Sequence, residues 1–580
     1  MTLPDNLTRW RVIAVAASAG RFGTAHASFE VSKPLMIESG LPRFACLGDA
    51  FEGRWVVHNR TGSGGLVHVE MDGEVRDVDL ADGATAAVAF PVRAEAVGPR
   101  TFRALARLGT HEDRLDITVP VRYPSATESV LLGGRIRRAQ DLSLPPFARI
   151  ESVELLLGRS ALVPMEGQLR ALLEYPHGCV EQTTSKTIPL LACHNLGIQG
   201  TGDMIAAGVR RLLSMQTPSG GLAYWPGQSD PLPAGSVYAT HALVLAARGG
   251  FDVPRPALDR ALKYVEGMLC EGVGIWQTYA LYVLSLAGRR HPAYLQSLER
   301  DPFLALAAIE MGLPDRARDI LRRPSPAPRS GPEVFHSPLR ARCATVIAKV
   351  RLGEAPGVSL GELMDEARLT YERAWTILAM GEMTAVSEGS GTFARISVDG
   401  RRLCEVSLRD LTRLSLAPGR VRIETDGEAW YTILVKGQQL TQGAEDHGFW
   451  LRRTYTRAGE TSPRLDFRPG DLVVVRVTVS ARKAGSYVAL EDPLPAGFEP
   501  VDLRFRTEAR FNLDGSPFSY QEQKDDRVFA SESWMPGLAE LVYLARATTP
   551  GTFRAPSARA EEMYSPGTWG RAPSSTVTIR

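Results

Sequence analysis

Glu174-Tyr-Pro-His-Gly-Cys-Val-Glu-Gln-Thr-Thr184 is the stretch on which the interpretation of the whole sequence depends. Within it, Cys179 and Gln182 stand at positions i and i+3, a separation that brings two side chains together on one helical turn. If the cysteine sulfur replaces the amide nitrogen of the glutamine, the two residues close an internal thioester. By spacing alone, an ordinary cysteine at the start of a helix, beside a polar neighbour, is the favoured interpretation.

The residues around this pair suit a reactive thioester. Gly178 is expected to allow a tight backbone beside the sulfur, and the hydroxyls of residues 183–185 are expected to satisfy free N–H groups where the helix begins. A thioester stores an electrophilic carbonyl carbon, which accepts a lysine amine or a hydroxyl while the cysteine leaves as a thiolate. Because water would destroy it, we expect the site to be buried and dry, with Tyr175 and Trp225 as suitable covers.

The region around and beyond this stretch has helical periodicity. Between about residues 161 and 384, apolar residues recur at i, i+3 and i+4 in short segments joined by Gly/Pro loops. With the helices that flank Cys179, the pattern predicts about twelve helices. An even number of short antiparallel helices suggests hairpins arranged in a ring, an α/α toroid. The predicted segments include residues 205–215, 237–248, 256–269, 275–287, 302–311, 314–321, 339–352 and 371–380.

Both ends of the chain have strand-like patterns instead. Alternating runs such as residues 66–70, followed by turns such as Asp72-Gly73, are typical of antiparallel sandwiches. After about residue 385 this character returns, and residues 394–406 predict a hairpin around Asp399-Gly400. The segments 124–160 and 385–440 are each too short to stand alone, so a helical domain inserted into one β domain is the economical interpretation.

Composition excludes several classes of function. A chain of 580 residues with 44% hydrophobic and 23% charged residues is typical of a soluble protein of several domains. The net charge is only +2 and no basic stripe with interleaved aromatic residues is present, so we expect no nucleic-acid partner. No apolar run is long enough for a transmembrane segment. We interpret residues 12–20 as a β-strand rather than a signal peptide.

The six cysteines form no metal or disulfide pattern. They are scattered without CxxC pairs, so neither a zinc site nor a disulfide framework is predicted, and we expect no metal and no cofactor. Cys193 and Cys270 lie in apolar helical runs and are expected in the core. His194 is expected on a helix surface, and His241 is expected to be a satisfied core histidine.

In combination, these motifs resemble the α2-macroglobulin and complement superfamily, and Tyr-Pro-x-Gly-Cys-x-Glu-Gln is similar to the thioester motif of its bacterial branch. Further matches follow in order along nearly the whole chain. Residues 3–11 resemble the segment after the bait region, residues 220–227 resemble a loop of the thioester domain, and residues 492–500, 525–527, 543–553 and 561–564 resemble the terminal sandwich of bacterial members. In this context the thioester is favoured over the ordinary cysteine.

The resemblance implies a multidomain architecture of β and α parts, with macroglobulin-type β-sandwiches and a split CUB-like β domain that holds an inserted α/α toroid thioester domain. The implied parts are residues 1–27, the end of a preceding macroglobulin-type β domain; 28–123, a macroglobulin-type β-sandwich; 124–160 and 385–440, the two parts of the CUB-like domain; 161–384, the thioester domain; and 441–580, a terminal macroglobulin or receptor-binding-like sandwich.

The resemblance also implies an endopeptidase inhibitor, not an enzyme, with a thioester that reacts once. In this family a protease cuts a bait segment, the molecule rearranges, and the exposed thioester captures the protease. Carried over to this sequence, Cys179 and Gln182 form the crosslink, Glu181 is the motif acid, and Tyr175 is the aromatic residue that shields it. His177 stands where bacterial members often carry another aromatic residue.

Target proteases are therefore the expected partners, together with an amino-terminal macroglobulin and bait portion that this sequence does not contain. We accordingly expect a fragment, or a half that needs a partner. The resemblance implies a periplasmic, cell-envelope or extracellular location. One departure is Thr370-Tyr-Glu-Arg-Ala-Trp375, which resembles a Thr-Gln-Glu-x-Ala-Trp pattern without its glutamine.

Three alternatives stay open. One is a non-covalent binding or structural module with an inactive thioester. Another is an α/α-toroid enzyme, although the helical region lacks the Asp-rich clusters and zinc-ligand sets that such enzymes need. The third is a cysteine hydrolase using Cys179 and His177, which is disfavoured because adjacent residues on one short loop do not readily form a nucleophile–base pair.

Two residues near the motif are interpreted in two ways. His177 either assists acyl transfer or fills an aromatic position on a surface loop, and the second is favoured. Tyr224 and Trp225 either line the thioester pocket or pack the toroid, with neither interpretation preferred.

Overall fold

The computed structural model describes residues 9–18, 20–125, 127–147, 149–160, 162–174, 177–195, 200–270, 276–322, 335–384, 393–408, 411–438, 442–501, 517–565 and 567–580. The chain divides into two compact units. One unit consists of Met1–Ala126 and Gln439–Arg580, and the other is Thr127–Gln438. None of the helices in these ranges is both long enough and apolar enough to cross a membrane.

All of the described helices belong to the second unit. They are α1 (Leu162–Glu174), α2 (Val180–Asn195), α3 (Gly202–Leu213), α4 (Pro233–Arg248), α5 (Arg255–Cys270), α6 (Gln277–Leu286), α7 (Tyr294–Ser297), α8 (Pro302–Glu310), α9 (Pro314–Arg322), α10 (Pro338–Arg351), α11 (Leu360–Glu366) and α12 (Thr370–Thr384). The predicted helices are confirmed, and so is the expected number of about twelve. The short helices α7 and α11 were not among the predicted segments.

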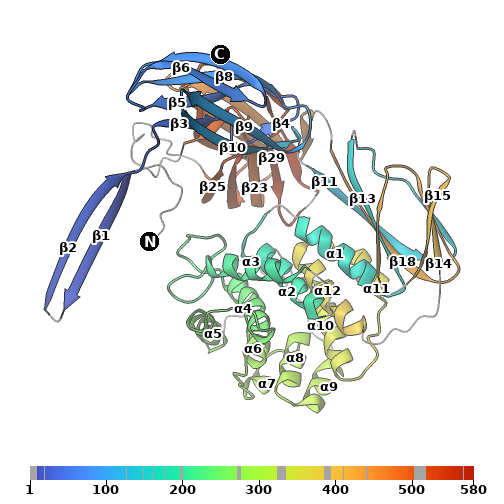
Figure 1. Ribbon diagram of the computed structural model, residues 1–580. Helices are drawn as coiled ribbons and strands as arrows, with labels where there is room; N and C mark the ends of the chain where they lie inside the picture. Colours follow the sequence, from blue (N-terminus) through green and yellow to red (C-terminus); the bar gives the residue numbers. More distant parts are fainter. Residues whose placement is uncertain are drawn as a thin grey trace. The chain divides into compact units, whose positions relative to one another are not determined.

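The helices form a closed ring with an inner and an outer layer (Figure 1). The inner helices α2, α4, α6, α8, α10 and α12 contact one another in that order, and α12 packs back on α2. Helices α4, α6 and α8 are buried on nearly every face, as expected of apolar helices in the middle of a domain. Outer helices such as α9 bury one face, through Ala317 and Ile320. The α/α toroid predicted from the sequence is therefore present.

Aromatic side chains fill the centre of the ring around one arginine. Arg340 of α10 is only 1% exposed, and its guanidinium carbon lies within 5.2 Å of four ring centroids. The four rings are those of Tyr238, Tyr279, Phe303 and Trp375, which come from four different inner helices. Cation–π attraction and dispersion therefore hold the inner layer together.

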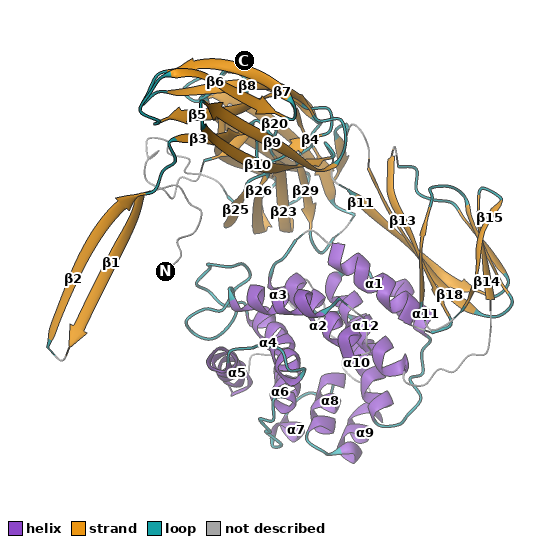
Figure 2. Cartoon of the chain, viewed as in Figure 1, coloured by secondary structure: helices purple, strands orange, loops and turns teal. Residues whose placement is uncertain are grey.

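Two four-stranded sheets complete this unit (Figure 2). Each sheet combines strands that precede the helices in the sequence with strands that follow them. Their strand orders are β11-β18-β13-β16 and β12-β17-β14-β15. The strands are β11 (Glu128–Ile136), β12 (Ala139–Leu142), β13 (Arg149–Gly158), β14 (Phe393–Val398), β15 (Arg401–Ser407), β16 (Thr412–Leu416), β17 (Val421–Thr425) and β18 (Ala429–Gln438). The predicted hairpin around Asp399-Gly400 joins β14 and β15, and both turn residues have the positive φ that its type I′ geometry requires. The helical domain is thus inserted into a split β domain.

Helix α1 attaches the ring to the first of these sheets. A Cβ atom on Gly167 would lie 2.4 Å from Cγ2 of Thr432, so the glycine allows α1 to approach β18 closely. The buried Glu166 also accepts hydrogen bonds from Nε and Nη2 of Arg413 on β16, at 3.0 and 2.8 Å. The bidentate geometry of this pair fixes α1 in orientation as well as in position.

In its described residues, the other unit contains strands and no helix. Its amino-terminal strands are β1 (Arg9–Ser18), β2 (Arg21–Glu30), β3 (Leu35–Gly40), β4 (Ala45–Cys46), β5 (Ala50–Asn59), β6 (Gly65–Met71), β7 (Glu74–Leu80), β8 (Thr85–Arg93), β9 (Gly98–Leu108) and β10 (His111–Arg122). Its carboxy-terminal strands are β19 (Glu445–His447), β20 (Phe449–Arg457), β21 (Asp466–Phe467), β22 (Leu472–Ala481), β23 (Gly485–Pro493), β24 (Phe498–Pro500), β25 (Tyr520–Lys524), β26 (Arg527–Met535), β27 (Leu538–Ala547), β28 (Gly551–Ala555), β29 (Arg559–Glu562), β30 (Trp569–Arg571) and β31 (Ser575–Ile579).

One sheet of this unit combines strands from both ends of the chain, and the others use strands from one end only. The strand orders are β4-β10-β9-β6-β7, β19-β30-β29-β23-β26-β25, β20-β22-β27-β24 and β21-β31-β28-β5-β3, with β8 paired to β5, while β1 and β2 form a separate hairpin. In the fourth sheet, Gly551 of β28 pairs with Phe51 of β5. One hydrophobic core runs through both segments. The sequence pattern did not indicate this pairing, because it joins residues about 500 positions apart.

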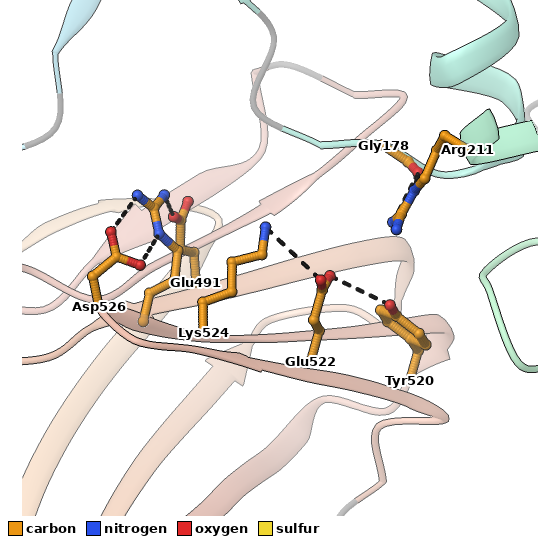
Figure 3. Close-up of polar contacts among 8 residues, drawn as sticks. Gly178, Arg211, Glu491, Tyr520, Glu522, Lys524 and Asp526 are labelled. Atoms are coloured by element: carbon orange, nitrogen blue, oxygen red, sulfur yellow. Dashed lines mark hydrogen bonds and ion pairs between the residues drawn. The ribbon is translucent and has the colours of Figure 1, made fainter. Parts of the chain in front are cut away.

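Polar contacts support the edge hairpin of this unit (Figure 3). Glu522 of β25 accepts a hydrogen bond from the Tyr520 hydroxyl at 3.3 Å and pairs with Lys524 at 3.9 Å. Arg527 of β26 pairs with Asp526 and Glu491. Charged side chains on an edge strand disfavour pairing with another chain.

Candidate thioester site

Cys179 and Gln182 lie together at the start of α2, and both side chains are fully buried. The backbone N–H of Cys179 donates to Oε1 of Gln182 at 3.2 Å, and the backbone N–H of Gln182 contacts Sγ of Cys179 at 3.5 Å. Each side chain therefore contacts the backbone N–H of the other residue, which brings the sulfur and the side-chain carbonyl group to the same helical turn. A buried pair with this geometry has the two groups from which a thioester forms.

Three residues hold the loop before α2 through hydrogen bonds. The N–H of Val180 donates to the carbonyl oxygen of Tyr224 at 3.0 Å. The carbonyl oxygen of Gly178 accepts from the Thr183 hydroxyl at 3.2 Å and from Arg211 of α3 at 3.4 Å (Figure 3). Because the first N–H groups and the preceding loop are bonded, the pair has a fixed position relative to the helix.

The structure corrects two expectations about this loop. A Cβ atom on Gly178 would meet nothing closer than 3.8 Å, and the residue does not have a positive φ, so neither space nor backbone strain requires glycine there. The hydroxyls of residues 183–185 donate to oxygen atoms instead of accepting from the free N–H groups of the helix: Thr184 donates to the carbonyl oxygen of Val180 at 2.7 Å, and Ser185 donates to Glu181. Hydroxyls inside a helix commonly bond back to the preceding turn in this way.

Glu181 connects α2 to α12. Its carboxyl group is fully buried and accepts hydrogen bonds from the Thr370 hydroxyl, at 2.9 Å to Oε1 and 2.8 Å to Oε2. Oε1 also accepts from Ser185, whose hydroxyl lies 3.0 Å from that of Tyr238 on α4. Three inner helices thus meet at the motif acid. Thr370 was not among the predicted site residues, although it begins the segment that resembles the Thr-Gln-Glu-x-Ala-Trp pattern, in which Tyr371 stands in place of the glutamine.

His177 is buried, with 7% of its surface exposed, so the favoured interpretation of a surface-loop residue is wrong in its placement. Its carbonyl oxygen accepts a hydrogen bond from Nζ of Lys186 at 3.2 Å. Lys186 was also missed in the sequence, where nothing distinguishes it except its position four residues after Gln182 on the same helix face. Tyr175, the expected cover, lies outside the described residues.

Tyr224 and Trp225 are buried, and their rings pack edge to face with centroids 5.5 Å apart. The Tyr224 carbonyl group borders the site through its bond to Val180. The N–H of Trp225 donates to Oε1 of Gln228 at 3.0 Å, which stabilises the turn after it. These contacts do not join the Trp225 side chain to Cys179 or Gln182, so its role as a cover of the site stays a prediction.

In the described part of the ring, Asp301 and the buried His241 have structural partners. Asp301 caps α8 by accepting from the N–H of Leu304 at 2.8 Å and also accepts from Thr278. His241 is buried and its Nδ1 lies 2.9 Å from the Tyr279 hydroxyl, which confirms the core placement, but its Nε2 is buried without a hydrogen-bond partner in the ranges that the structure describes, so the histidine is satisfied at one nitrogen only. Among the described residues no group of three or more His, Cys, Asp or Glu side chains could hold a metal ion.

The cysteine expectations are confirmed in one case and corrected in another. Cys193 is fully buried beside the exposed His194, as predicted. Cys270 is exposed, because it is the last residue of α5, where the apolar face of the helix ends.

Two family models match the sequence. One describes the α2-macroglobulin family and matches residues 1–71, and the other describes the bacterial α2-macroglobulin MG10 domain and matches residues 448–567. Among curated proteins, the α2-macroglobulin of Xylella fastidiosa strain 9a5c is 27% identical over all of this chain and 41% of its own length. That of Escherichia coli K12 is 25% identical over 98% of this chain and 40% of its own length. The chain thus spans about two fifths of the length of these relatives.

Solved structures share the fold. The native E. coli α2-macroglobulin structure that spans domain MG7 to the C-terminus matches with a TM-score of 0.79 at 21% identity, covering 95% of this chain and 99% of that one. A Salmonella α2-macroglobulin that had reacted with methylamine matches with a TM-score of 0.81 at 22% identity, covering all of this chain and 43% of that one. At this identity the likeness concerns the fold.

A ring of helices inserted into a split β domain, with β segments before and after it in the sequence, is the fold that this chain shares with the solved α2-macroglobulin structures. Two segments match α2-macroglobulin family models, and over nearly its whole length the chain is similar to the carboxy-terminal portion of bacterial α2-macroglobulins.

Proposed function

We propose that Cys179 and Gln182 form an internal thioester through which this chain captures proteases covalently. The observation that carries the proposal is the buried contact between the two residues, in which each backbone N–H meets the other residue's reacting group. Condensation of the thiol with the carboxamide joins Sγ to the Gln182 carbonyl carbon and releases ammonia. The reaction with a target is then the reverse kind of acyl substitution.

The bond between the Cys179 N–H and Oε1 of Gln182 gives this site a means of activation. In a thioester the same oxygen becomes the acyl oxygen, and it carries the negative charge of the tetrahedral intermediate when an amine attacks. A backbone N–H already directed at that oxygen stabilises the developing charge without reorganisation. The N-terminal end of α2 adds a favourable dipole at the same position.

The target class follows from the chemistry and the family. A lysine amine of a protease attacks the acyl carbon, an amide bond to Gln182 forms, and the Cys179 sulfur leaves. Because Cys179 and Gln182 are fully buried, a lysine carried on a protease reaches the bond only after a rearrangement, for which cleavage of a bait segment by the protease is the trigger in this family. The capture consumes the thioester, so the protein acts once and is an inhibitor rather than an enzyme.

The same proposal includes the partners, the location and the domain division of the inhibitor. Its partners are target proteases and an amino-terminal macroglobulin and bait portion, and its location is the periplasm or cell envelope. The domain division stays part of the proposal, with the thioester domain at residues 161–384, the CUB-like domain at 124–160 and 385–440, and sandwiches at 28–123 and 441–580. The residues before 28 would end a preceding domain.

The experiment that tests this function measures thiol release. Methylamine added to the undenatured protein should release one thiol, detected with a chromogenic disulfide reagent, while adding about 31 Da to the protein, the stoichiometry of aminolysis. Cys179→Ala should show neither change, and Cys193→Ala, which removes an equally buried thiol at the other end of α2, should behave as the wild type. A wild-type protein that gains no methylamine would contradict the proposal and favour a module with an inactive thioester.

A further inference from the structure

Lys186 lies on the same face of α2 as the Cys–Gln pair. It follows Gln182 by four residues and Cys179 by seven, and two helical turns take up about seven residues. Long side chains on a helix extend toward its N-terminal end. In agreement with this, Nζ of Lys186 reaches back to the carbonyl oxygen of His177 at 3.2 Å, two residues before the cysteine.

The surroundings of this amine are unusual for a lysine. Burial lowers the pKa of Lys186 to about 8, while the nearby Cys179 and Glu181 act in the opposite direction and raise it. Of the helices packed on α2, α3 brings Arg211 to the Gly178 carbonyl group, α4 brings the Tyr238 hydroxyl to Ser185, and α12 brings the Thr370 hydroxyl to Glu181. Lys186 is thus a partly buried amine whose Nζ lies against the loop that carries Cys179, close enough for charge on the sulfur to raise its pKa.

We propose that Lys186 is the acid that receives the Cys179 thiolate when the acyl group leaves, first by pairing with it and then by giving it a proton. This inference rests on the proposed function, because it assigns a residue to the thioester's own reaction.

The nitrogen of the attacking amine forms a bond to the Gln182 carbonyl carbon and loses one proton to water. The bond from that carbon to Sγ of Cys179 breaks, and its electron pair stays on the sulfur. The Lys186 ammonium group transfers a proton to the sulfur and regains one from solvent. The products are an amide at Gln182 and a neutral thiol at Cys179.

This arrangement favours the transition state over the closed thioester. A thioester sulfur carries almost no charge, so the ammonium group gains little from it before the reaction. As the bond breaks, a full negative charge develops at a site where Cys179 and Gln182 are fully buried, and burial makes an unpaired charge costly. An interaction that strengthens only as the charge develops accelerates the reaction.

The test compares Lys186→Met, Lys186→Arg and, as a control, Lys263→Met on the exposed face of α5. In each purified protein we would measure the thioester by intact mass, methylamine-dependent thiol release between pH 6 and 9, and alkylation of the freed Cys179 thiol. Lys186→Met should form the thioester but release its thiol about tenfold more slowly, because a cation beside a thiolate changes its acidity by at least one pH unit.

The alkylation profile separates pairing from proton transfer. Lys186→Arg should keep the freed sulfur reactive at low pH, because a guanidinium group pairs with a thiolate, but it should lose the pH dependence near 8, because arginine does not give up its proton. Lys186→Met should lose both properties, and Lys263→Met should keep both. If Lys186→Met does not form the thioester, alkylation of its Cys179 thiol still reports on the pairing.

Two results would overturn the inference. One is a Lys186→Met protein whose thiol release and alkylation follow the wild-type pH profile. The other is an amide between Gln182 and Lys186 in the wild type, found by peptide mapping, because Lys186 would then be a nucleophile rather than an acid. Failure of the proposed function is a separate outcome, since the wild type itself would then lack the thioester mass.

Discussion

The Thr370 hydroxyl donates to both carboxyl oxygens of Glu181, joining residues 189 positions apart at distances of 2.9 and 2.8 Å. Glu181 lies in the first inner helix of the ring and Thr370 begins the last, so this contact lies where the ring closes. It also lies one residue from Gln182. Closure of the ring and positioning of the candidate thioester therefore depend on the same side chains.

Replacement of Thr370 by Val should loosen this closure. The change keeps the shape but leaves a buried carboxyl group without one of its donors, so the free energy of unfolding should fall by about 1–3 kcal/mol. Urea unfolding followed by the helical circular-dichroism signal measures it. Thr345→Val in α10 is a matched control, because the Thr345 hydroxyl bonds only back to Ala341 of its own helix among the contacts described. Equal losses in the two variants would contradict a special role for Thr370.

Arg340→Lys should destabilise the ring although it keeps the positive charge. The planar guanidinium group lies over four aromatic rings and also donates to the Phe335 carbonyl oxygen at 2.5 Å. An ammonium group cannot stack on several rings at once, so we expect a loss of about 2–4 kcal/mol in the free energy of unfolding. Arg342→Lys on the same helix, where the side chain forms a half-exposed ion pair with Glu366, should cost less than about 1 kcal/mol.

Acid should destabilise the helical ring, and His241 should be one cause. Burial, followed by Arg340, lowers the pKa of His241 and of His336 to about 3. Below about pH 6.5 the unfolded chain therefore binds protons that the folded ring excludes. Asp301 acts in the opposite direction, because burial raises its pKa to about 6, so that the folded state binds its proton first.

Between pH 6 and 4 the unfolded chain binds two more protons at His241 and His336, whereas the folded ring binds one more proton at Asp301. The unfolded state therefore binds one more proton in total, so these groups lower the free energy of unfolding as the pH falls. Each proton contributes about 1.4 kcal/mol per pH unit. His241→Gln removes one of these protons, so the slope of the free energy of unfolding against pH should fall by about 1.4 kcal/mol per pH unit, whatever the effect of the substitution at pH 7. Urea titrations at several pH values measure this slope. An unchanged slope would mean that His241 is already protonated in the folded ring.

A glycine pair tests the packing of α1 on the split β domain. Gly167→Ala would place a Cβ atom 2.4 Å from Cγ2 of Thr432, and overpacking of this kind costs about 1–3 kcal/mol. Gly267→Ala in α5 meets nothing within 4 Å and should instead stabilise by up to about 1 kcal/mol, because alanine favours helix. Thr432→Ala should rescue the first variant. Stabilisation by both alanines would show that α1 can move away from β18.

The sequence predicted the parts of this fold that depend on local pattern. Helices such as α4 and α10 and the hairpin at Asp399-Gly400 follow from periodicity and turn chemistry. The contact between Cys179 and Gln182 follows from their spacing on one turn. These features involve residues close together in the chain, where geometry restricts the choices.

Long-range features could not be predicted in the same way. The pairing of Gly551 with Phe51 and the bond of Thr370 to Glu181 join distant segments, and no local pattern encodes such partners. The direction of a hydroxyl bond, as at Thr184, depends on whether a carbonyl oxygen of the preceding turn is within reach. Cys270 was misplaced because periodicity gives the apolar face but not the residue at which the helix leaves the core.

The most direct test of the account is the intact mass of the freshly purified, undenatured chain. A thioester between Cys179 and Gln182 forms with loss of ammonia, so the wild type should weigh about 17 Da less than its sequence requires, and Cys179→Ala should have its full sequence mass. A wild-type protein at full sequence mass, with a Cys179 thiol that titrates before any amine is added, would contradict the central claim.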